Sequence, residues 1–185
     1  MGNDFNSLIK KLNLTEYRYL FEDIYQDGIT KDNISDAIAE FEKTLITPNA
    51  PFDQYLKGDD KALSKEAKEG YELFKNKGCI SCHHGVNVGG NMYNKFGVMV
   101  DIKTTNLGKY NVTKNEEDKY YFKVPSLRNI EHTAPYFHDA RTSSLHEAVK
   151  IMSLFQLGRP ISKDEISKIV EFLKSLSGEL PKGIK

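Results

Sequence analysis

Hydrophobic residues recur every three or four positions in the first third of the chain. A short amphipathic stretch near the start is followed by a longer one, whose apolar positions are Ile34, Ala37, Ile38, Phe41 and Leu45. This spacing predicts helices, because residues three and four apart share one helix face. The longer helix is expected to open at Thr30 or Asn33 and to stop before Pro48.

Three further helices are predicted in the rest of the chain. The first runs from about Ser64 to Lys77 and has a regular apolar side. The last two begin with sequences that fit a capping box, at Ser144 and at Ser162. The apolar face of the helix after Ser144 consists of Leu145, Val149 and Met152.

Residues 85–142 have a different pattern, with many glycines and no sustained helical repeat. A connection of this length without long elements is uncommon inside a compact domain. Such a connection is expected if the segment wraps around a large prosthetic group, because that group then supplies the apolar interior. One extended piece is predicted near Tyr121, because Pro125 pushes Val124 out of the helical region.

Composition and charge narrow the class of protein. The 185 residues include 26 basic and 26 acidic side chains, and 39% are hydrophobic, which favours a folded globular domain. A net charge of zero argues against broad nucleic-acid binding. No apolar run approaches the roughly 20 residues of a membrane span. The residues from Met1 to Leu8 lack the basic and apolar regions of an export signal.

The two cysteines of the chain lie in a Cys-x-x-Cys-His pattern made by Cys79, Cys82 and His83. A disulfide across two residues would stabilise little, and a thioredoxin-like pair would follow a strand rather than a helix. A zinc site would need a second pair of ligands. The pattern is typical of the attachment site of a c-type haem, with zinc or a bare dithiol as the non-haem alternatives.

The order of these residues suits haem attachment. Thiols three positions apart lie about one helical turn from each other, so they can bond two neighbouring vinyl groups of one porphyrin edge. His83 then lies beneath the ring as an axial ligand of the iron, whereas His84 is expected to be exposed or near a propionate. Because bacteria attach haem outside the cytoplasm, we expect a periplasmic protein whose signal peptide is absent from this chain.

The second axial ligand decides whether the iron relays electrons or binds peroxide. The candidates by residue type are Met92, Met99, Met152, His132, His138 and His146. A methionine on an apolar helix face, as predicted for Met152, is usually there for packing. The pattern alone does not separate these residues.

Several other segments are similar to one known family. They are Ala37–Glu42, Thr44–Pro48, Phe52–Asp59, Leu73–Phe74, Gly89–Gly90, Pro125–Asn129, Thr133–His138 and Gln156–Gly158. Together with the cysteine motif, they make residues 3–181 resemble the C-terminal part of bacterial dihaem cytochrome c peroxidases. The resemblance implies an all-α, cytochrome c-like helical domain wrapped around one haem, with long irregular loops. We expect an N-terminal helical extension at residues 1–60, left from an interdomain region, the haem domain at 61–181 and a tail at 182–185.

The resemblance also implies roles for particular residues. The family's C-terminal haem is its electron-entry site and has His and Met as ligands, which correspond to His83 and Met152. Relatives that mature methylamine dehydrogenase have a Tyr in place of the Met, so this branch is disfavoured. Arg128 is a candidate partner for a haem propionate, or else forms a structural ion pair. The family binds calcium between its domains, and the backbone oxygens of Thr133 and Pro135 match two of the ligands.

The chain departs from the family by having one Cys-x-x-Cys-His motif and no tryptophan, so the peroxidatic domain is expected to be missing. We therefore predict a one-haem oxidoreductase domain. It would take electrons from a small cytochrome c or copper protein and pass them to a peroxidatic haem that reduces hydrogen peroxide. The alternative is a stand-alone haem peroxidase that acts after Met152 is lost, with His132, His138 or Glu147 moving protons. A homodimer is suggested by the resemblance alone.

Overall fold

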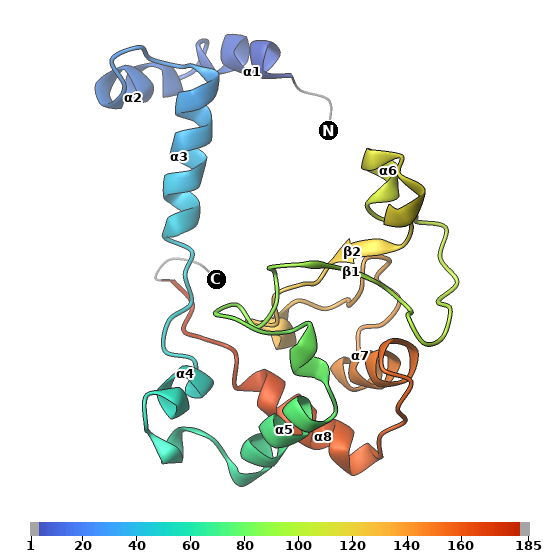
Figure 1. The fold of residues 1–185 in the computed structure, drawn as a ribbon. Coiled ribbons are helices and arrows are strands. Elements are labelled where there is room, and N and C mark those ends of the chain that lie inside the picture. Colours follow the sequence, from blue (N-terminus) through green and yellow to red (C-terminus); the bar gives the residue numbers. More distant parts are fainter. Residues whose placement is uncertain (1–3, 182–185) are drawn as a thin grey trace. The chain divides into compact units, whose positions relative to one another are not determined.

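The computed structural model describes residues 4–181, which form mostly helices (Figure 1). The chain divides into two compact units. The smaller contains the described residues up to Thr47 and those from Leu180 onward, and the larger runs from Pro48 to Glu179. No helix within residues 4–181 is long and apolar enough to cross a membrane.

The helices of the smaller unit, among its described residues, are α1 (Phe5–Leu12), α2 (Tyr17–Ile24) and α3 (Lys31–Lys43). The start of α3 confirms the predicted position, because the Thr30 hydroxyl accepts a hydrogen bond from the Asn33 backbone N–H at 3.1 Å. The Asn33 side chain in turn donates to the Gly28 carbonyl at 2.7 Å, which holds the preceding turn.

Much of the apolar surface of the smaller unit is exposed. In its three helices Ile34 is the buried residue. The large apolar side chains left exposed in the described part of this unit are Phe5, Leu14, Tyr17, Tyr19, Leu20, Ile24, Ile38, Phe41, Leu45, Ile46 and Leu180. Exposed apolar residues gathered in this number within one small unit are unusual for a monomeric protein.

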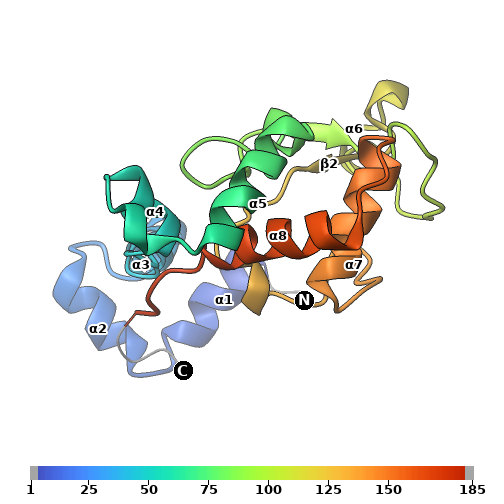
Figure 2. The same ribbon diagram turned by 90° about the horizontal axis from the view of Figure 1, so that it is seen from below.

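The core of the larger unit lies where two long helices cross. These helices, which Figure 2 shows side by side with α4 (Pro51–Leu56) nearby, are α5 (Lys65–Asn76) and α8 (Lys163–Lys174). The ring centroid of Phe172 lies 5.1 Å from those of both Phe52 and Phe74. This aromatic cluster, with Ile169 and Leu173, is the buried centre of the unit.

Side-chain caps explain where the two crossing helices start. The Ser64 hydroxyl accepts from the Ala67 N–H at 3.0 Å at the start of α5. At the start of α8, Ser162 and Glu165 form the predicted capping box, in which each side chain accepts from the other's backbone N–H. Both predicted helix starts are therefore confirmed.

Residues 85–142 contain only short elements, as expected. They are β1 (Tyr93–Lys95), α6 (Tyr110–Thr113) and β2 (Tyr121–Lys123), together with 3-10 turns. The two strands pair antiparallel, with Asn94 opposite Phe122. The extended piece before Pro125 is confirmed as β2, whereas β1 was not predicted, because a strand of three residues shows no alternation of polar and apolar positions.

The helix α7 (Leu145–Ile151) ends one residue earlier than its apolar pattern suggested. Met152–Gln156 form a π-helical turn, in which the Leu157 N–H donates to the Met152 carbonyl at 3.3 Å. Such turns within helices are frequent at functional sites. Met152 is thus not part of a regular helical stripe, and its side chain reaches a cavity described below.

The structure groups residues 48–60 with the larger unit, whereas the sequence analysis placed them in the N-terminal extension. Phe52 of α4 is buried, and its N–H donates to the Ser175 carbonyl at 3.0 Å, so α4 is tied to the end of α8. The prolines around this segment indicated a break but not this packing. The predicted tail at 182–185 lies outside the described residues.

The crossing of α5 and α8 generates a prediction about Gly70. A Cβ atom at this position would lie 1.9 Å from the Lys168 carbonyl oxygen. Gly70→Ala would gain about 1 kcal/mol of helix propensity, but forcing an atom into a packed site costs about 1–3 kcal/mol. We expect a net loss of stability in urea unfolding, because a backbone carbonyl cannot rotate away.

The exposed Lys65→Ala change in the same helix is the control, and surface changes of this kind stay within about 0.5 kcal/mol. A Gly70→Ala protein as stable as the control would show that the two helices can separate without cost.

Candidate functional site

A cavity of about 510 Å³ in the larger unit brings together the residues of the cysteine motif and the π-helical turn. Cys79, Cys82, His83 and Met152 all line it. The rest of the wall is mostly apolar and includes Phe74, Phe96, Phe122, Leu127, Ile130, Phe137, Val149 and Leu173. Four residues that the sequence analysis assigned to one haem therefore surround one space.

The cysteines lie on a tight turn that continues from α5. Gly78 has a φ of 99°, a conformation that favours glycine, and it turns the chain into the 3-10 turn Cys79–Ser81. The His83 N–H donates to the Cys79 carbonyl at 3.0 Å, so one helical turn carries all three residues of the motif. Both thiols are free, and the Asn94 amide donates to the Cys82 Sγ at 3.1 Å.

Burial controls the protonation of the first thiol. Loss of solvation raises the pKa of the Cys79 thiol to about 11, so this group is protonated at neutral pH. A protonated thiol is a slow nucleophile toward oxidants and metals. The Cys79 thiol is consequently not poised as a reactive nucleophile.

The imidazole of His83 is largely buried and is oriented by backbone. Burial lowers the pKa of His83, an effect opposed by the carbonyl oxygens of Val88 and Pro125, which face the ring. Neither carbonyl completes a hydrogen bond, so Nδ1 is buried without a partner among the described residues. The ring is therefore neutral, the form in which histidine binds iron, and Nε2 is left available to a ligand.

Gly89 allows the backbone to approach this side of the imidazole. Its φ is +126°, and a Cβ atom there would lie 2.1 Å from the Pro125 carbonyl oxygen and 3.3 Å from His83 Nδ1. A side chain at position 89 would therefore collide with the segment that faces the ring. The sequence analysis quoted Gly89 for its resemblance only, and gave it no role.

Of the six candidates for a second axial ligand, Met152 and His138 line the cavity. His138 already has partners, because its Nε2 lies 3.2 Å from the Thr104 hydroxyl and its ring stacks on Phe122 with centroids 4.0 Å apart. Met152 is held by the backbone of the π-helical turn, and its thioether is a soft ligand suited to haem iron.

The other four candidates do not line the cavity. Met99 is 61% exposed, and the side chain of His132 is likewise exposed and pairs with Glu131 at 3.4 Å. Among the candidates, the geometry therefore favours Met152.

Gln156 is a site residue that the sequence analysis missed. Its side chain accepts from the Gly97 N–H and donates to the Lys95 carbonyl, both at 3.0 Å. These bonds join the π-helical turn to the segment after β1 and so hold together two walls of the cavity. The pairing spans about sixty residues of sequence, and no local pattern could have revealed it.

The charges on the cavity wall have one sign. No Asp or Glu is among the described residues that line it, whereas Lys77, Lys95, Lys123 and Arg159 are. Lys77 pairs with Glu165 at 2.6 Å, and no ion pair within residues 4–181 involves the other three. The cavity is thus suited to an apolar group that carries anionic substituents.

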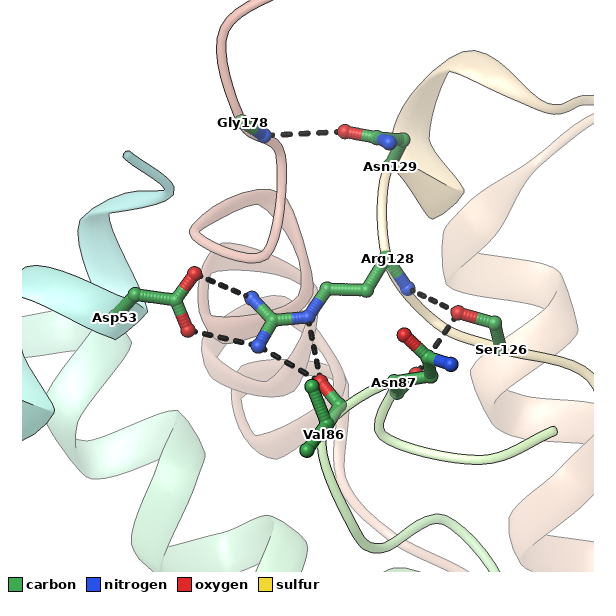
Figure 3. Close-up of polar contacts among 7 residues, drawn as sticks. All are labelled: Asp53, Val86, Asn87, Ser126, Arg128, Asn129 and Gly178. Carbon is green, nitrogen blue, oxygen red and sulfur yellow. Dashed lines mark hydrogen bonds and ion pairs between the residues drawn. The ribbon is translucent and has the colours of Figure 1, made fainter. Parts of the chain in front are cut away.

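Arg128 does not line this cavity. Its guanidinium forms a bidentate pair with Asp53 at 2.7 and 2.9 Å and donates two further bonds to the Val86 carbonyl (Figure 3). Of the two roles considered for Arg128, this placement favours the structural ion pair over the propionate contact.

The two residues predicted as calcium ligands are placed differently with respect to the cavity. Thr133 is on the cavity wall and Pro135 is not, and the Thr133 hydroxyl donates to the Ile130 carbonyl at 3.1 Å. Within the described part of the chain, no three His, Cys, Asp or Glu residues are placed to hold a metal ion. Calcium at Thr133 and Pro135 stays a prediction.

The residues present fit a covalently bound haem. The cavity is apolar, two free thiols lie on one turn of its wall, and the neutral imidazole of His83 lines it with Nε2 available to a ligand. A thioether sulfur and several unpaired cations complete the wall. Each feature matches one part of a haem: its ring, its vinyl groups, its iron and its carboxylates.

Two family models match the chain. A model described as di-haem cytochrome c peroxidase matches residues 1–61, and one described as cytochrome c matches residues 67–177. A crystal structure of a MauG-like protein associated with microbial copper homeostasis is similar in fold, with a TM-score of 0.71 and 24% identity over 85% of this chain and 60% of that one. The cytochrome c-like, mostly helical fold is thus confirmed.

Three curated proteins are similar over most of the chain. Cytochrome c551 peroxidase of Nitrosomonas europaea is 49% identical over 91% of this chain and 51% of its own length. The cytochrome c peroxidase of Escherichia coli is 46% identical (85% and 35%), and cytochrome c551 peroxidase of Pseudomonas aeruginosa is 43% identical (83% and 46%). The chain therefore spans about half of these relatives or less.

Two neighbouring glycines provide a test of the His83 environment. Gly89→Ala places a Cβ against Pro125, whereas Gly90 has a similar left-handed φ of +81° and nothing within 4 Å of its Cβ position. We expect Gly89→Ala to lower both the haem content per chain and the midpoint of thermal unfolding. Gly90→Ala should lower the free energy of unfolding only by the strain of a left-handed residue, about 1–2 kcal/mol.

Haem content is measured by the pyridine haemochrome assay on protein matured in the periplasm. If the two variants lose haem and stability equally, backbone strain alone explains the glycines and the contact with Pro125 has no special role.

Proposed function

Because the chain belongs to the dihaem cytochrome c peroxidase family and contains a cytochrome c domain, we propose that it is the electron-entry domain of such an oxidoreductase and binds one haem c. The observation that carries this proposal is the single cavity lined by both thiols, His83 and Met152. When bound, the haem supplies a one-electron redox couple. This domain would receive electrons from a donor protein and pass them to a peroxidatic haem elsewhere.

Cys79 and Cys82 would hold the haem covalently, each thiol by adding its S–H across one vinyl group to give a thioether, a step that needs no oxidant. This addition is favoured by thiols that are free, and Cys79 is protected from oxidation by the burial that raises its pKa. The Asn94 amide, which donates to the Cys82 Sγ, orients the second sulfur.

His83 and Met152 are the residues that would hold the haem iron in this proposal. His83 presents a neutral Nε2, since its Nδ1 side faces backbone carbonyls. Met152 would supply a thioether sulfur to the iron, which would close the iron to small ligands and raise its reduction potential. Gln156 supports Met152 by joining its turn to the segment after β1.

The wall residues give the site its environment. The aromatic side chains of Phe96, Phe122 and Phe137 exclude water from one side, and Phe96 and Phe137 stack with centroids 5.3 Å apart. The unpaired cations Lys95, Lys123 and Arg159 are available to the haem carboxylates, in the place that the sequence analysis proposed for Arg128.

Two features support a partner domain that carries the peroxidatic haem. Residues 1–61 match the di-haem model, and this part of the chain exposes many apolar side chains that its own unit does not cover. We further infer a small cytochrome or copper protein as electron donor and a periplasmic location, where bacteria attach haem to thiols. Calcium and homodimer formation rest on the resemblance to the family.

Replacing the second axial ligand tests the proposal. Met152→Ala should abolish the sulfur-to-iron absorption band of the oxidised protein and lower its reduction potential, because the methionine ligand favours the reduced iron. Met99→Ala is the matched control, since Met99 is exposed and does not line the cavity. An unchanged band in the Met152 variant would refute the assignment, and loss of the band in the control would reassign the ligand.

Peroxide turnover separates the electron-transfer domain from a stand-alone peroxidase. His138 is the one specific residue in favour of the second function, because it is on the cavity wall and burial lowers its pKa, which leaves it neutral as a base. We expect the isolated, matured chain to reduce hydrogen peroxide no faster than free haem. Turnover well above that rate, lost in His138→Gln, would establish the alternative.

A further inference from the structure

We propose that Arg128 and Asp53 are positioning residues for His83. Their ion pair fixes the Arg128 guanidinium, whose bonds to the Val86 carbonyl join the two loops that enclose the Nδ1 side of the imidazole, and it thereby tunes the reduction potential of the iron that His83 would bind. This inference rests on the proposed ligation of haem iron by His83. It concerns a pair of residues about 75 positions apart in sequence, neither of which lines the cavity.

The guanidinium of Arg128 connects three parts of the larger unit. It forms a bidentate pair with Asp53 of α4, at 2.9 Å for Nη1 and 2.7 Å for Nη2. Its Nε and Nη2 also donate to the Val86 carbonyl at 3.0 and 2.9 Å. Figure 3 shows Arg128 between these two partners, so that four hydrogen bonds lead from one side chain to α4 and to the loop after the cysteine motif.

The backbone around Arg128 is bonded to the same loop. The Ser126 hydroxyl donates to the Asn87 carbonyl at 2.8 Å and accepts from the Arg128 N–H at 3.1 Å. The Leu127 N–H is shared between the carbonyls of Asn87 and Val88, at 3.3 Å each. Residues 86–88 and 126–128 are thus held together by both side-chain and backbone bonds (Figure 3).

The two loops meet on one side of His83. Gly90 donates to the Val124 carbonyl at 2.9 Å, so the loops remain paired beyond Gly89 and Pro125. At Gly89 the space between the Pro125 carbonyl and His83 Nδ1 is too small for a Cβ atom. The carbonyls of Val88 and Pro125, one from each loop, both act on the His83 imidazole, and the Pro125 carbonyl lies on its Nδ1 side.

The ion pair between Arg128 and Asp53 is largely shielded from solvent, so breaking it carries a cost in free energy. The side chains of Arg128 and Asp53 are only 19% and 29% exposed, and the guanidinium has both carboxylate oxygens and a carbonyl as acceptors. Removing one member leaves the other charge partly buried without its partner, which favours a local rearrangement of the loops. The segment most directly affected is 86–89, which carries the Val88 carbonyl.

The consequence for His83 follows from the chemistry of a bound imidazole. Neither the Val88 carbonyl nor the Pro125 carbonyl completes a hydrogen bond to Nδ1 in this structure, but the negative ends of their dipoles make the ring a stronger electron donor, and this stabilises the oxidised iron. If the loops move apart, the carbonyls withdraw, the ring becomes a weaker donor, and the reduction potential rises. This direction is opposite to the one expected when the methionine ligand is lost.

The experiment compares reduction potentials of the matured holoprotein in Asp53→Asn and Arg128→Lys with the unaltered chain. Asn keeps the shape of Asp without its charge, and Lys keeps the charge without the bidentate fork. Loss of groups that orient a metal ligand typically costs 10- to 100-fold in metal affinity or activity. We expect the equilibrium to shift at least about tenfold toward the reduced form, an increase of about 59 mV for one electron.

Lys168→Gln is the matched control. Lys168 pairs with Glu69 at 3.0 Å and with Asp164 at 2.7 Å, an ion-pair group of similar size between α5 and α8 that touches neither loop. Its loss should lower stability without changing the potential. In addition, the Nδ1 proton of His83, followed by NMR of histidine-labelled protein, should exchange with solvent faster in the two Arg128–Asp53 variants only.

Ser126→Ala removes one link between the same loops and keeps the ion pair. It should raise the potential in the same direction by a smaller amount, and it provides the measurement if the other variants fail to mature. An unchanged potential in all variants that mature, or an equal shift in Lys168→Gln, overturns the inference. An unaltered chain without histidine-ligated haem would instead refute the proposed function.

Discussion

The crossing of α5 and α8 at Gly70 is the contact on which the rest of the larger unit depends. With no side chain at this point, the two helices approach until the Lys168 carbonyl nearly touches the glycine. The close approach brings Phe74 and Phe172 together and closes the aromatic core. Because α5 runs directly into the cysteine turn, the same contact determines where Cys79 and His83 lie relative to the cavity.

The cavity shows why the middle of the chain can lack long elements. Residues 85–142 bury few side chains among themselves, and many of their apolar residues face the cavity instead. In a packed protein such a space would be costly, since buried apolar surface is stabilising only when it meets other atoms. A bound haem would fill this space and turn the loops into part of a core that includes the cofactor.

Backbone groups control the chemistry of the site as much as side chains do. The imidazole of His83 is kept neutral by burial and faces carbonyl oxygens from two loops. Those loops are tied to each other and to α4 through Arg128, which is outside the cavity. The position of Arg128 therefore favours a structural role, which is to connect these loops to α4, over a contact with a haem propionate.

The amino-acid sequence alone was sufficient for the features that depend on neighbours in the chain. The starts of α3, α5 and α8 follow from caps within a few residues, and the thiol–thiol–imidazole order follows from one helical turn. The π-helical turn at Met152, the partners of Gln156 and the Arg128–Asp53 pair were decided only by the tertiary structure. Each of these depends on groups that are far apart in sequence or on a backbone distortion, and no spacing rule encodes such distances.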